Sequence, residues 1–597
     1  MSFKNKVKSY LSKPHNVILL ILSVLLFFFT LIPLFSLIRD SFQVHPSELI
    51  SVPGSSVGDL TLHHWRKVFF DPSISKVMFY TPLWNSIKVS LGSTFIAIAL
   101  GGTVAWLIAR SNIRFKSAIS TLFVLPYVMP SWTLAMAWLN FFRNSHIGGS
   151  PGLFTALTGI ETANWFAYGA FPIAVVLGLH YAPFAYILIG GILRNMDANL
   201  EEAATILQTS RFRILTKITL PIVMPAILST FLLTFSSSMS AFAVPAFLGT
   251  PVRFQVLTTQ MFRTLNGLNP GYGYIMSIVL IVIGVAVLAI NQWIVGSRRS
   301  FTTVTGKSSQ ISLVDLKKLR TPISIVLSVI LLLIAIVPLI TFAIESFILA
   351  PGDYSLNNFT SLFWIGEGRT DIGGGEPGIL RNRYVFLGLW NSLKLAGFSA
   401  LIAGTVGVLT GYSVVKGKRS RLAKVVNNLA FFPYLMPAMA FGAIYLSMFS
   451  QRNWFIPSLY GTFALLVLVG SIKYLPFASR SGVNAMLQLS DEIEEAAIIQ
   501  GVSWQKRMRK IIFPIQKASF LSGYLLPFIS AMRELSLFIL LITPANRILT
   551  TMLFQYNEKG WNQYANAINL MIIVIVLSIN YIVNKLTGAS IDKGIGG

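Results

Sequence analysis

Two short acidic motifs stand at corresponding places in the two halves of this sequence. The first is Glu202-Ala203-Ala204 and the second is Glu495-Ala496-Ala497, and Pro221 and Pro514 follow the two glutamates at the same distance. A glutamate near a helix start is stabilised by the helix dipole, and alanines favour a helix while leaving a low surface. This chemistry predicts a short helix onto which another protein docks, rather than a catalytic site.

Arg533 and Glu534 are ionisable residues inside a long apolar run, and Ser240 is aligned with Arg533 in the first half. An ionisable group at membrane depth costs on the order of 3 kcal/mol and usually faces protein or water. These three residues are therefore candidates for a translocation path. A structural ion pair with a neighbouring helix is the alternative for the two charged residues, and both interpretations remain open. His180 and Lys473 fit snorkelling or interhelical groups better.

The sequence gives little support for a catalytic site or a bound cofactor. No His/Asp/Glu cluster has catalytic spacing, and the absence of cysteine excludes disulfides and thiolate metal sites. Gly306-Lys307-Ser308 is a fragment of a phosphate loop, but Phe301 stands where the pattern requires glycine. We therefore expect no enzymatic activity, no metal site and no cofactor bound by this chain.

The composition indicates a membrane protein. Of the 597 residues, 54% are hydrophobic and only 11% are charged, so the bilayer is the expected solvent. The net charge of +26 comes mostly from short segments between apolar runs, which indicates topology bias and not a nucleic-acid partner. The first apolar run, 17–38, exceeds the core of a signal peptide and lacks a cleavage pattern, so we expect a retained span.

Apolar runs of roughly 20 residues are long enough to cross a bilayer as helices. The sequence predicts an all-α fold of about twelve transmembrane helices. Their predicted ranges are 17–38, 84–109, 118–140, 171–192, 222–246, 273–295, 323–346, 386–413, 426–449, 459–479, 518–543 and 566–584. The distribution of Lys and Arg predicts that both termini and both acidic motifs lie in the cytoplasm.

The two halves match in four blocks that occur in the same order. Besides the acidic motifs, the matching blocks begin at Trp84 and Trp390, at Leu125 and Phe432, and at His180 and Lys473. Each half has six predicted spans, so the two copies share one orientation and form a parallel repeat with a pathway between them. We expect domains at 1–305 and 306–597. The proline pairs Pro126/Pro130 and Pro433/Pro437 predict kinks in the third and ninth spans.

The duplicated motif resembles the "EAA" loop of binding-protein-dependent ABC importer permeases, and the resemblance covers nearly the whole chain. It implies that two copies of an ATPase subunit, which uses ATP, dock on the loops and that an extracytoplasmic binding protein delivers the cargo. It also implies that the membrane is the inner membrane of a bacterium. The docking residues that the resemblance implies are Glu202, Ala203, Ala204, Glu495, Ala496, Ala497 and Gly501. Gly501 matches the glycine of the family's motif, but Gln208 stands at that place in the first loop. We therefore expect the first docking helix to end in a different way.

Within that superfamily the chain resembles the fused double permeases of the ferric iron group. The segments that carry this resemblance are Val244–Gly249, Val256–Thr259 and Arg533-Glu534-Leu535, although Ser536 replaces the proline of the last motif. Ferric iron is the expected cargo. The alternatives are thiamine, a polyamine or another small solute carried by the same fold. An ion-coupled secondary transporter is the alternative from another class; it predicts a relay of intramembrane carboxylates, whereas only Glu534 lies deep in a predicted span.

Overall fold

The computed structural model describes residues 3–196, 199–296, 313–450 and 457–587, and this part of the chain contains helices and no strand. The all-α membrane fold is confirmed. Nine helices are long and apolar enough to cross a membrane, or up to eleven if each of two bent pairs counts as one span. The proposed boundary between 305 and 306 and the Gly306-Lys307-Ser308 fragment lie outside the described residues.

Each half is built around three helices that pack against one another. In the first half they are α5 (Thr81–Arg110), α11 (Ala170–Asn195) and α14 (Leu220–Met239), and in the second half they are α20 (Arg383–Lys416), α23 (Phe463–Leu487) and α27 (Lys517–Met532). The last long helix is α17 (Pro270–Gly296) in the first half and α29 (Asn562–Thr587) in the second. The repeated sequence thus produces repeated packing.

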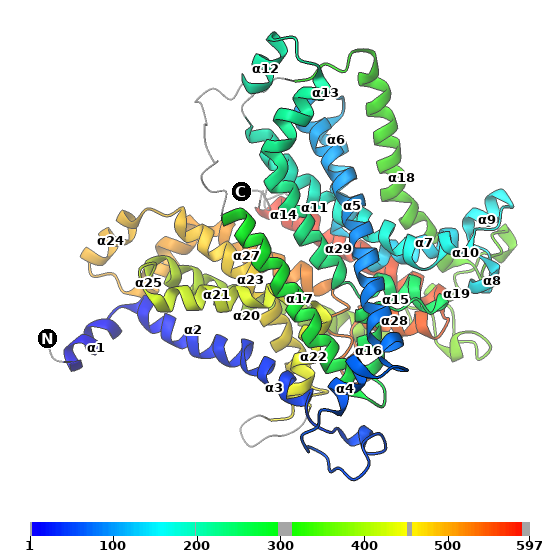
Figure 1. Ribbon diagram of the computed structural model, residues 1–597, viewed down its shortest axis with the longest axis horizontal. Coiled ribbons are helices and arrows are strands. Elements are labelled where there is room, and N and C mark those ends of the chain that lie inside the picture. Colours follow the sequence, from blue (N-terminus) through cyan, green and yellow to red (C-terminus); the bar gives the residue numbers. More distant parts are fainter. Residues whose placement is uncertain (1–2, 197–198, 297–312, 451–456, 588–597) are drawn as a thin grey trace.

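The first span of each half packs against the other half (Figure 1). Helix α2 (Pro14–Thr30) lies along α20 and α21 (Arg421–Leu435), and α3 (Ile32–Asp40) contacts α22 (Ala438–Phe449). Leu19, Leu22 and Leu26 of α2 share one buried apolar cluster with residues of the second half. Conversely, α18 (Arg320–Phe347) packs against α6 (Lys116–Val128) and α7 (Ser131–Phe142), as well as against α29.

The predicted spans 118–140 and 426–449 are each broken into two helices, so neither is one straight helix. The bend between α6 and α7 is 95°, and the bend between α21 and α22 is 109°. Pro130 and Pro437 lack the N–H that would continue the first helix of each pair. The predicted kinks at the proline pairs are confirmed, and they are sharp enough to change the direction of the chain.

The predicted span 518–543 is wrong over its second part. Helix α27 ends at Met532 and has 16 residues, and the following segment forms turns before α28 (Leu549–Glu558) begins. This segment is apolar because it is buried in protein: Leu535, Leu537 and Phe538 are at most 1% exposed. Irregular backbone at membrane depth is tolerated where protein covers it. Apolar composition alone therefore overestimates the helix.

Short helices surround these bundles. Between α3 and α4 (His63–Phe70) the chain forms an irregular lobe. This lobe lies away from α12 (Asn199–Ile206) and α24 (Asp491–Ile499), toward the opposite end of the molecule (Figure 1). The remaining short helices on that side are α8 (Ser145–Gly148), α9 (Leu153–Thr158), α10 (Asn164–Ala167), α15 (Ala243–Gly249), α16 (Leu257–Leu265) and α19 (Leu362–Ile365). The two acidic motifs therefore lie at the opposite end of the molecule from most of its short connecting helices.

Candidate functional site

The two acidic motifs form short helices that project from the ends of the bundles, α12 from the first half and α24 from the second (Figure 1). Ser490 caps α24, since its hydroxyl accepts a hydrogen bond of 3.4 Å from the backbone N–H of Glu492. After each helix the chain returns through a short α-helix and a π-helical turn. These are α13 (Arg211–Ile214) with η3 (Leu215–Thr219), and α25 (Trp504–Arg507) with η9 (Met508–Ile512).

The two motif helices, α12 and α24, end in the same way, which contradicts the expectation of a different ending in the first loop. Gln208 has φ 57° and Gly501 has φ 72°, so both residues adopt the left-handed conformation. The following N–H groups, of Thr209 and Val502, each donate a 3.0 Å hydrogen bond to the carbonyl of the second motif alanine. In both loops, these hydrogen bonds satisfy a carbonyl group that would otherwise be free at the C-terminal end of the helix. A residue with a β-carbon therefore accepts the left-handed turn here, at a cost of about 1 kcal/mol.

We predict that exchanging the two turn residues changes helix stability more than docking. Gln208→Gly will stabilise the first loop by about 1 kcal/mol, and Gly501→Gln will destabilise the second by a similar amount. No atom lies within 4 Å of a β-carbon built on Gly501, so the larger side chain meets open space. Thermal unfolding of each purified variant and co-purification with the ATPase subunit measure the two effects. Complete loss of docking in Gly501→Gln would contradict this prediction.

The motif residues are divided between an exposed and a buried side. Ala203, Glu495 and Ala496 are exposed and Glu202 is half-buried, whereas Ala204 and Ala497 are buried at 9% and 8% exposure. The second alanine of each motif therefore packs toward the protein, and the glutamate and the first alanine are open to a partner. The role of these residues and of Gly501 in docking stays a prediction.

An acidic residue that was not among the predicted site residues fastens the first motif helix, α12, to a membrane helix. Glu201, one residue before the motif, accepts a 2.5 Å hydrogen bond from the Nη2 atom of Arg110. Arg110 is the last residue of α5 and is 1% exposed. The Thr219 hydroxyl donates a second hydrogen bond of 2.6 Å to Glu201. Through Glu201, α12 is therefore tied both to the end of α5 and to the turn that leads into α14.

In the second half, α24 is attached to the end of α20 by equivalent contacts that involve different side chains. Glu494 is 3% exposed, lies 2.8 Å from the Lys416 ammonium and 3.4 Å from Arg507, and accepts a 3.0 Å hydrogen bond from the Tyr412 hydroxyl. Lys416 also contacts Asp491 at 2.7 Å, and this hydrogen bond lowers the pKa of Asp491. Lys416 is the last residue of α20, as Arg110 is of α5.

The repeat marks the four residues of the Arg110–Glu201 and Lys416–Glu494 pairs as charged residues at equivalent positions, although it does not show which of them meet. Arg110 and Lys416 are separated by as many residues as the aligned Trp84 and Trp390, and Glu201 and Glu494 by as many as Pro221 and Pro514. A base and an acid therefore occupy equivalent positions in both halves.

The broken helices leave carbonyl groups that side chains of neighbouring helices bind. The carbonyl of Pro126 faces the position of Pro130, which has no N–H to donate, and the Nδ1 atom of His180 lies 3.1 Å from it. In the second half the Nζ atom of Lys473 donates to the carbonyls of Pro433 at 3.0 Å and Met436 at 2.5 Å. Of the two roles expected for His180 and Lys473, snorkelling or interhelical contact, the structure shows the interhelical contact for both.

Arg533 connects the two halves at the first of these breaks. It directly follows α27, and its Nη1 atom donates to the carbonyls of Tyr127 at 2.9 Å and Val128 at 3.1 Å. Its guanidinium carbon lies 5.8 Å from the centre of the Tyr127 ring. Ser240 directly follows α14 in the equivalent place, but its hydroxyl donates to Ser236 of its own helix at 2.7 Å.

Glu534 is held within the second half. Its carboxylate accepts a 3.2 Å hydrogen bond from the Tyr474 hydroxyl and a 3.1 Å hydrogen bond from the backbone N–H of Leu537. Within the described residues neither Arg533 nor Glu534 takes part in an ion pair of 4.0 Å or less. Both side chains are half-buried. Their place in a translocation path stays a prediction.

Two like helical bundles, each with an exposed helix fastened to its end, define the chain as a multi-pass membrane permease. It belongs to the family described as the binding-protein-dependent transport system inner membrane component, whose model matches residues 97–300 and 403–590. The part of the chain that the structure describes holds no group of three or more His, Cys, Asp or Glu residues that could bind a metal ion.

Several relatives share long stretches with the chain. The ferric transport system permease protein FbpB of Actinobacillus pleuropneumoniae is 26% identical over 511 residues, which are 83% of this chain and 70% of the relative. The Fe(3+)-transport system permease protein FbpB 2 of Haemophilus influenzae is 22% identical over 83% of this chain and 87% of the relative. The spermidine/putrescine permease protein PotC of the same organism is 26% identical over 35% of this chain and 74% of the relative.

A solved structure of a bacterial ABC transporter that imports the acidic polysaccharide alginate covers 43% of this chain and 88% of the matched chain. Its TM-score is 0.34 and its sequence identity 17%.

Proposed function

We propose that this chain is the permease of an ATP-driven importer for ferric iron. Its family places it among the membrane subunits of ABC importers, which are transport subunits. The cargo, the docking of two ATPase subunits on α12 and α24, and delivery by an extracytoplasmic binding protein are the parts that we propose. No cofactor bound by this chain is needed, since ATP is used by the partner subunit.

The fastened docking helices are the observation that carries this proposal. A partner that hydrolyses ATP must move membrane helices, so its contact point has to be joined firmly to them. Glu201 joins α12 to the end of α5, and Glu494 joins α24 to the end of α20. An ion-coupled secondary transporter has no use for two such helices, and family membership also favours the importer.

The central path is proposed to run between the halves, near Arg533, Glu534 and Ser240. Arg533 and Ser240 end equivalent helices, and Arg533 reaches across to the broken helix of the other half. A half-buried charge at membrane depth usually faces protein or water. These observations support a polar passage whose wall changes when the two halves move apart.

Ferric iron is the proposed cargo because relatives named for ferric transport match along 83% of the chain. A polyamine is the second candidate, supported by the similarity to PotC over 35% of the chain. Thiamine remains an alternative that only the sequence resemblance suggests. Selectivity is proposed to reside mainly in the binding protein.

We predict that uptake of ferric iron requires ATP and the binding protein. Right-side-out vesicles that contain the assembled transporter will be loaded with ATP and given labelled ferric iron together with the binding protein. Labelled iron will accumulate in these vesicles, and it will not accumulate when either component is omitted. Labelled spermidine and thiamine, each offered with the same binding protein, are the matched tests of the alternatives. Uptake driven by a proton gradient without ATP would contradict the importer mechanism.

A further inference from the structure

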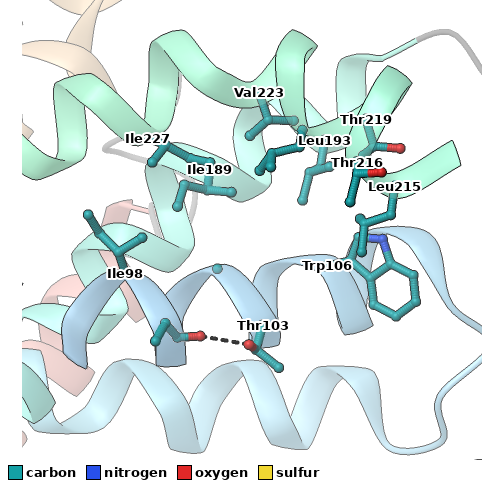
Figure 2. A pocket seen from close by; sticks show the side chains of 13 residues that line it. Ile98, Thr103, Trp106, Ile189, Leu193, Leu215, Thr216, Thr219, Val223 and Ile227 are labelled. Atoms are coloured by element: carbon teal, nitrogen blue, oxygen red, sulfur yellow. Dashed lines mark hydrogen bonds between the residues drawn. The ribbon is translucent and has the colours of Figure 1, made fainter. Parts of the chain in front are cut away.

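An apolar groove in the first half runs between α5, α11 and the start of α14. Its volume is about 480 Å³, which is within the range of roughly 300–1,000 Å³ that is common for ligand sites. Figure 2 shows Ile98 and Ile227 at one end and Trp106, Leu215 and Thr216 at the other. Most of the lining side chains between these ends are aliphatic. The groove therefore suits a long apolar ligand.

The groove exists because the two halves differ in side-chain size at equivalent positions. Gly404 of the second half corresponds to Ile98, and a β-carbon added to Gly404 would lie 2.3 Å from the Tyr524 ring. The glycine thus lets α27 approach α20 closely, which Ile98 prevents between α14 and α5. Phe520, which corresponds to Ile227, is fully buried and stacks on Phe513 at 5.5 Å.

The walls of the groove face the bilayer. In the most apolar stretches of the helices that contain α5 and α14, only 33% and 28% of residues are buried inside the protein, against 67% for the helix that contains α11. Two lipid-facing helices therefore form the walls, and a buried helix forms the floor. An apolar groove that opens between such helices is in contact with acyl chains, not with water.

Polar and basic groups mark one end of the groove. Trp106, Thr216 and Thr219 lie there (Figure 2), and tryptophan is typical of the membrane–water interface. Lys217 is on the same turn as Thr216, and Arg213 lies one helical turn earlier; both are exposed. Each Lys or Arg near a membrane surface contributes about 1 kcal/mol of attraction for anionic lipid.

We propose that this groove binds one phospholipid with an anionic headgroup. Its acyl chain lies along Val223 and Ile227, in the space that aromatic side chains occupy in the second half. Its headgroup lies beside Lys217 and Arg213. Thr219 lines the groove and also donates to Glu201 of the docking helix, so the lipid supports the segment that fastens the first docking loop.

The test uses the full chain in vesicles of phosphatidylethanolamine and phosphatidylglycerol that contain a trace of photoreactive phosphatidylglycerol with the reactive group on the acyl chain. Irradiation will produce adducts on α5 and α14 of the wild type, located by peptide mass spectrometry. The double variant Gly102→Val and Ile227→Phe copies Val408 and Phe520 of the second half, fills the groove and will lose these adducts. Val282→Phe, at an exposed apolar site on α17, is the matched control and will retain them.

The headgroup is tested by replacing the two basic residues with glutamine. Lys217→Gln and Arg213→Gln will each lower the preference for phosphatidylglycerol over phosphatidylethanolamine roughly fivefold, as native mass spectrometry of the retained lipid measures. Equal labelling of the groove in the wild type and in the filled variant would overturn the site. Equal retention of the two lipids by the wild type would overturn the anionic headgroup. These readouts do not depend on transport, so they stay informative if the cargo is not iron.

Discussion

Glu201→Gln will detach the first docking helix from α5, while the neighbouring change Glu202→Gln will leave it attached. Arg110 is 1% exposed, and among the described residues its Nε and Nη1 atoms have no hydrogen-bond partner, so Glu201 supplies its ion pair. Removing one partner of a buried pair costs about 3–5 kcal/mol because the other charge stays buried. Glu202 lies outside this pair, and its replacement should weaken docking alone.

Thermal unfolding and co-purification of the ATPase subunit separate the two effects. Glu201→Gln is expected to lower both stability and docking, and Glu202→Gln only docking. The double exchange Arg110→Glu with Glu201→Arg should restore part of the stability, since it keeps opposite charges at the two positions. Wild-type stability of Glu201→Gln would show that the ion pair does not fasten the loop.

The equivalent change in the second half, Glu494→Gln, should have a smaller effect. Lys416 retains its contact with Asp491 at 2.7 Å, so its charge is not left without a partner. Arg507 also retains its 2.6 Å hydrogen bond to the carbonyl of Val502. A smaller loss of stability in Glu494→Gln than in Glu201→Gln would therefore follow from geometry, even though the two glutamates are equivalent in the repeat.

Arg533→Met will abolish most transport while the ATPase subunit still docks. The methionine has similar length but donates no hydrogen bond, so it leaves the carbonyls of Tyr127 and Val128 without their contact from the other half. Each buried polar group that loses its partner costs about 1–3 kcal/mol. The loss falls at the break between α6 and α7, far along the chain from either docking helix.

Uptake and co-purification, measured on the same preparations, test this separation. Ser240→Ala is the matched control, because Ser240 ends the equivalent helix but bonds only within it; it should transport nearly as well as the wild type. Arg533→Lys keeps the charge with a single-point donor and should retain intermediate activity. Wild-type uptake by Arg533→Met would remove Arg533 from the mechanism.

The repeat, the membrane class and the two short helices that carry the acidic motifs were predictable because each depends on local sequence. Periodic apolar runs and the duplicated motif are visible without any tertiary contact. The Pro126/Pro130 spacing also indicates which carbonyl loses its helical N–H partner, and in the structure the Nδ1 atom of His180 lies beside that carbonyl. Residues 533–543 show the limit: their apolar composition indicates burial equally well in lipid or in protein, and only packing decides which.

The ion pairs that attach the two motif helices were harder to predict, because each joins residues that are far apart in the chain. Nothing near Arg110 in the sequence indicates that it meets Glu201, and an isolated glutamate at a helix start has a sufficient explanation in the helix dipole. The turn at Gln208 was mispredicted for a related reason. Its intrinsic preference disfavours a left-handed conformation, but the hydrogen bond from Thr209 to the carbonyl of Ala204 outweighs that preference.

The exchange of first spans between the halves has a consequence for synthesis. Helix α2 enters the membrane first, yet Leu19, Leu22 and Leu26 pack against residues of the second half, such as Val426 and Leu475. Until the ribosome has made those residues, the face of α2 that will be buried in this cluster remains against lipid. The amino-terminal span therefore cannot complete its packing before the carboxy-terminal half has been synthesised. Folding of the membrane domain is expected to finish late, after the whole polypeptide has been made.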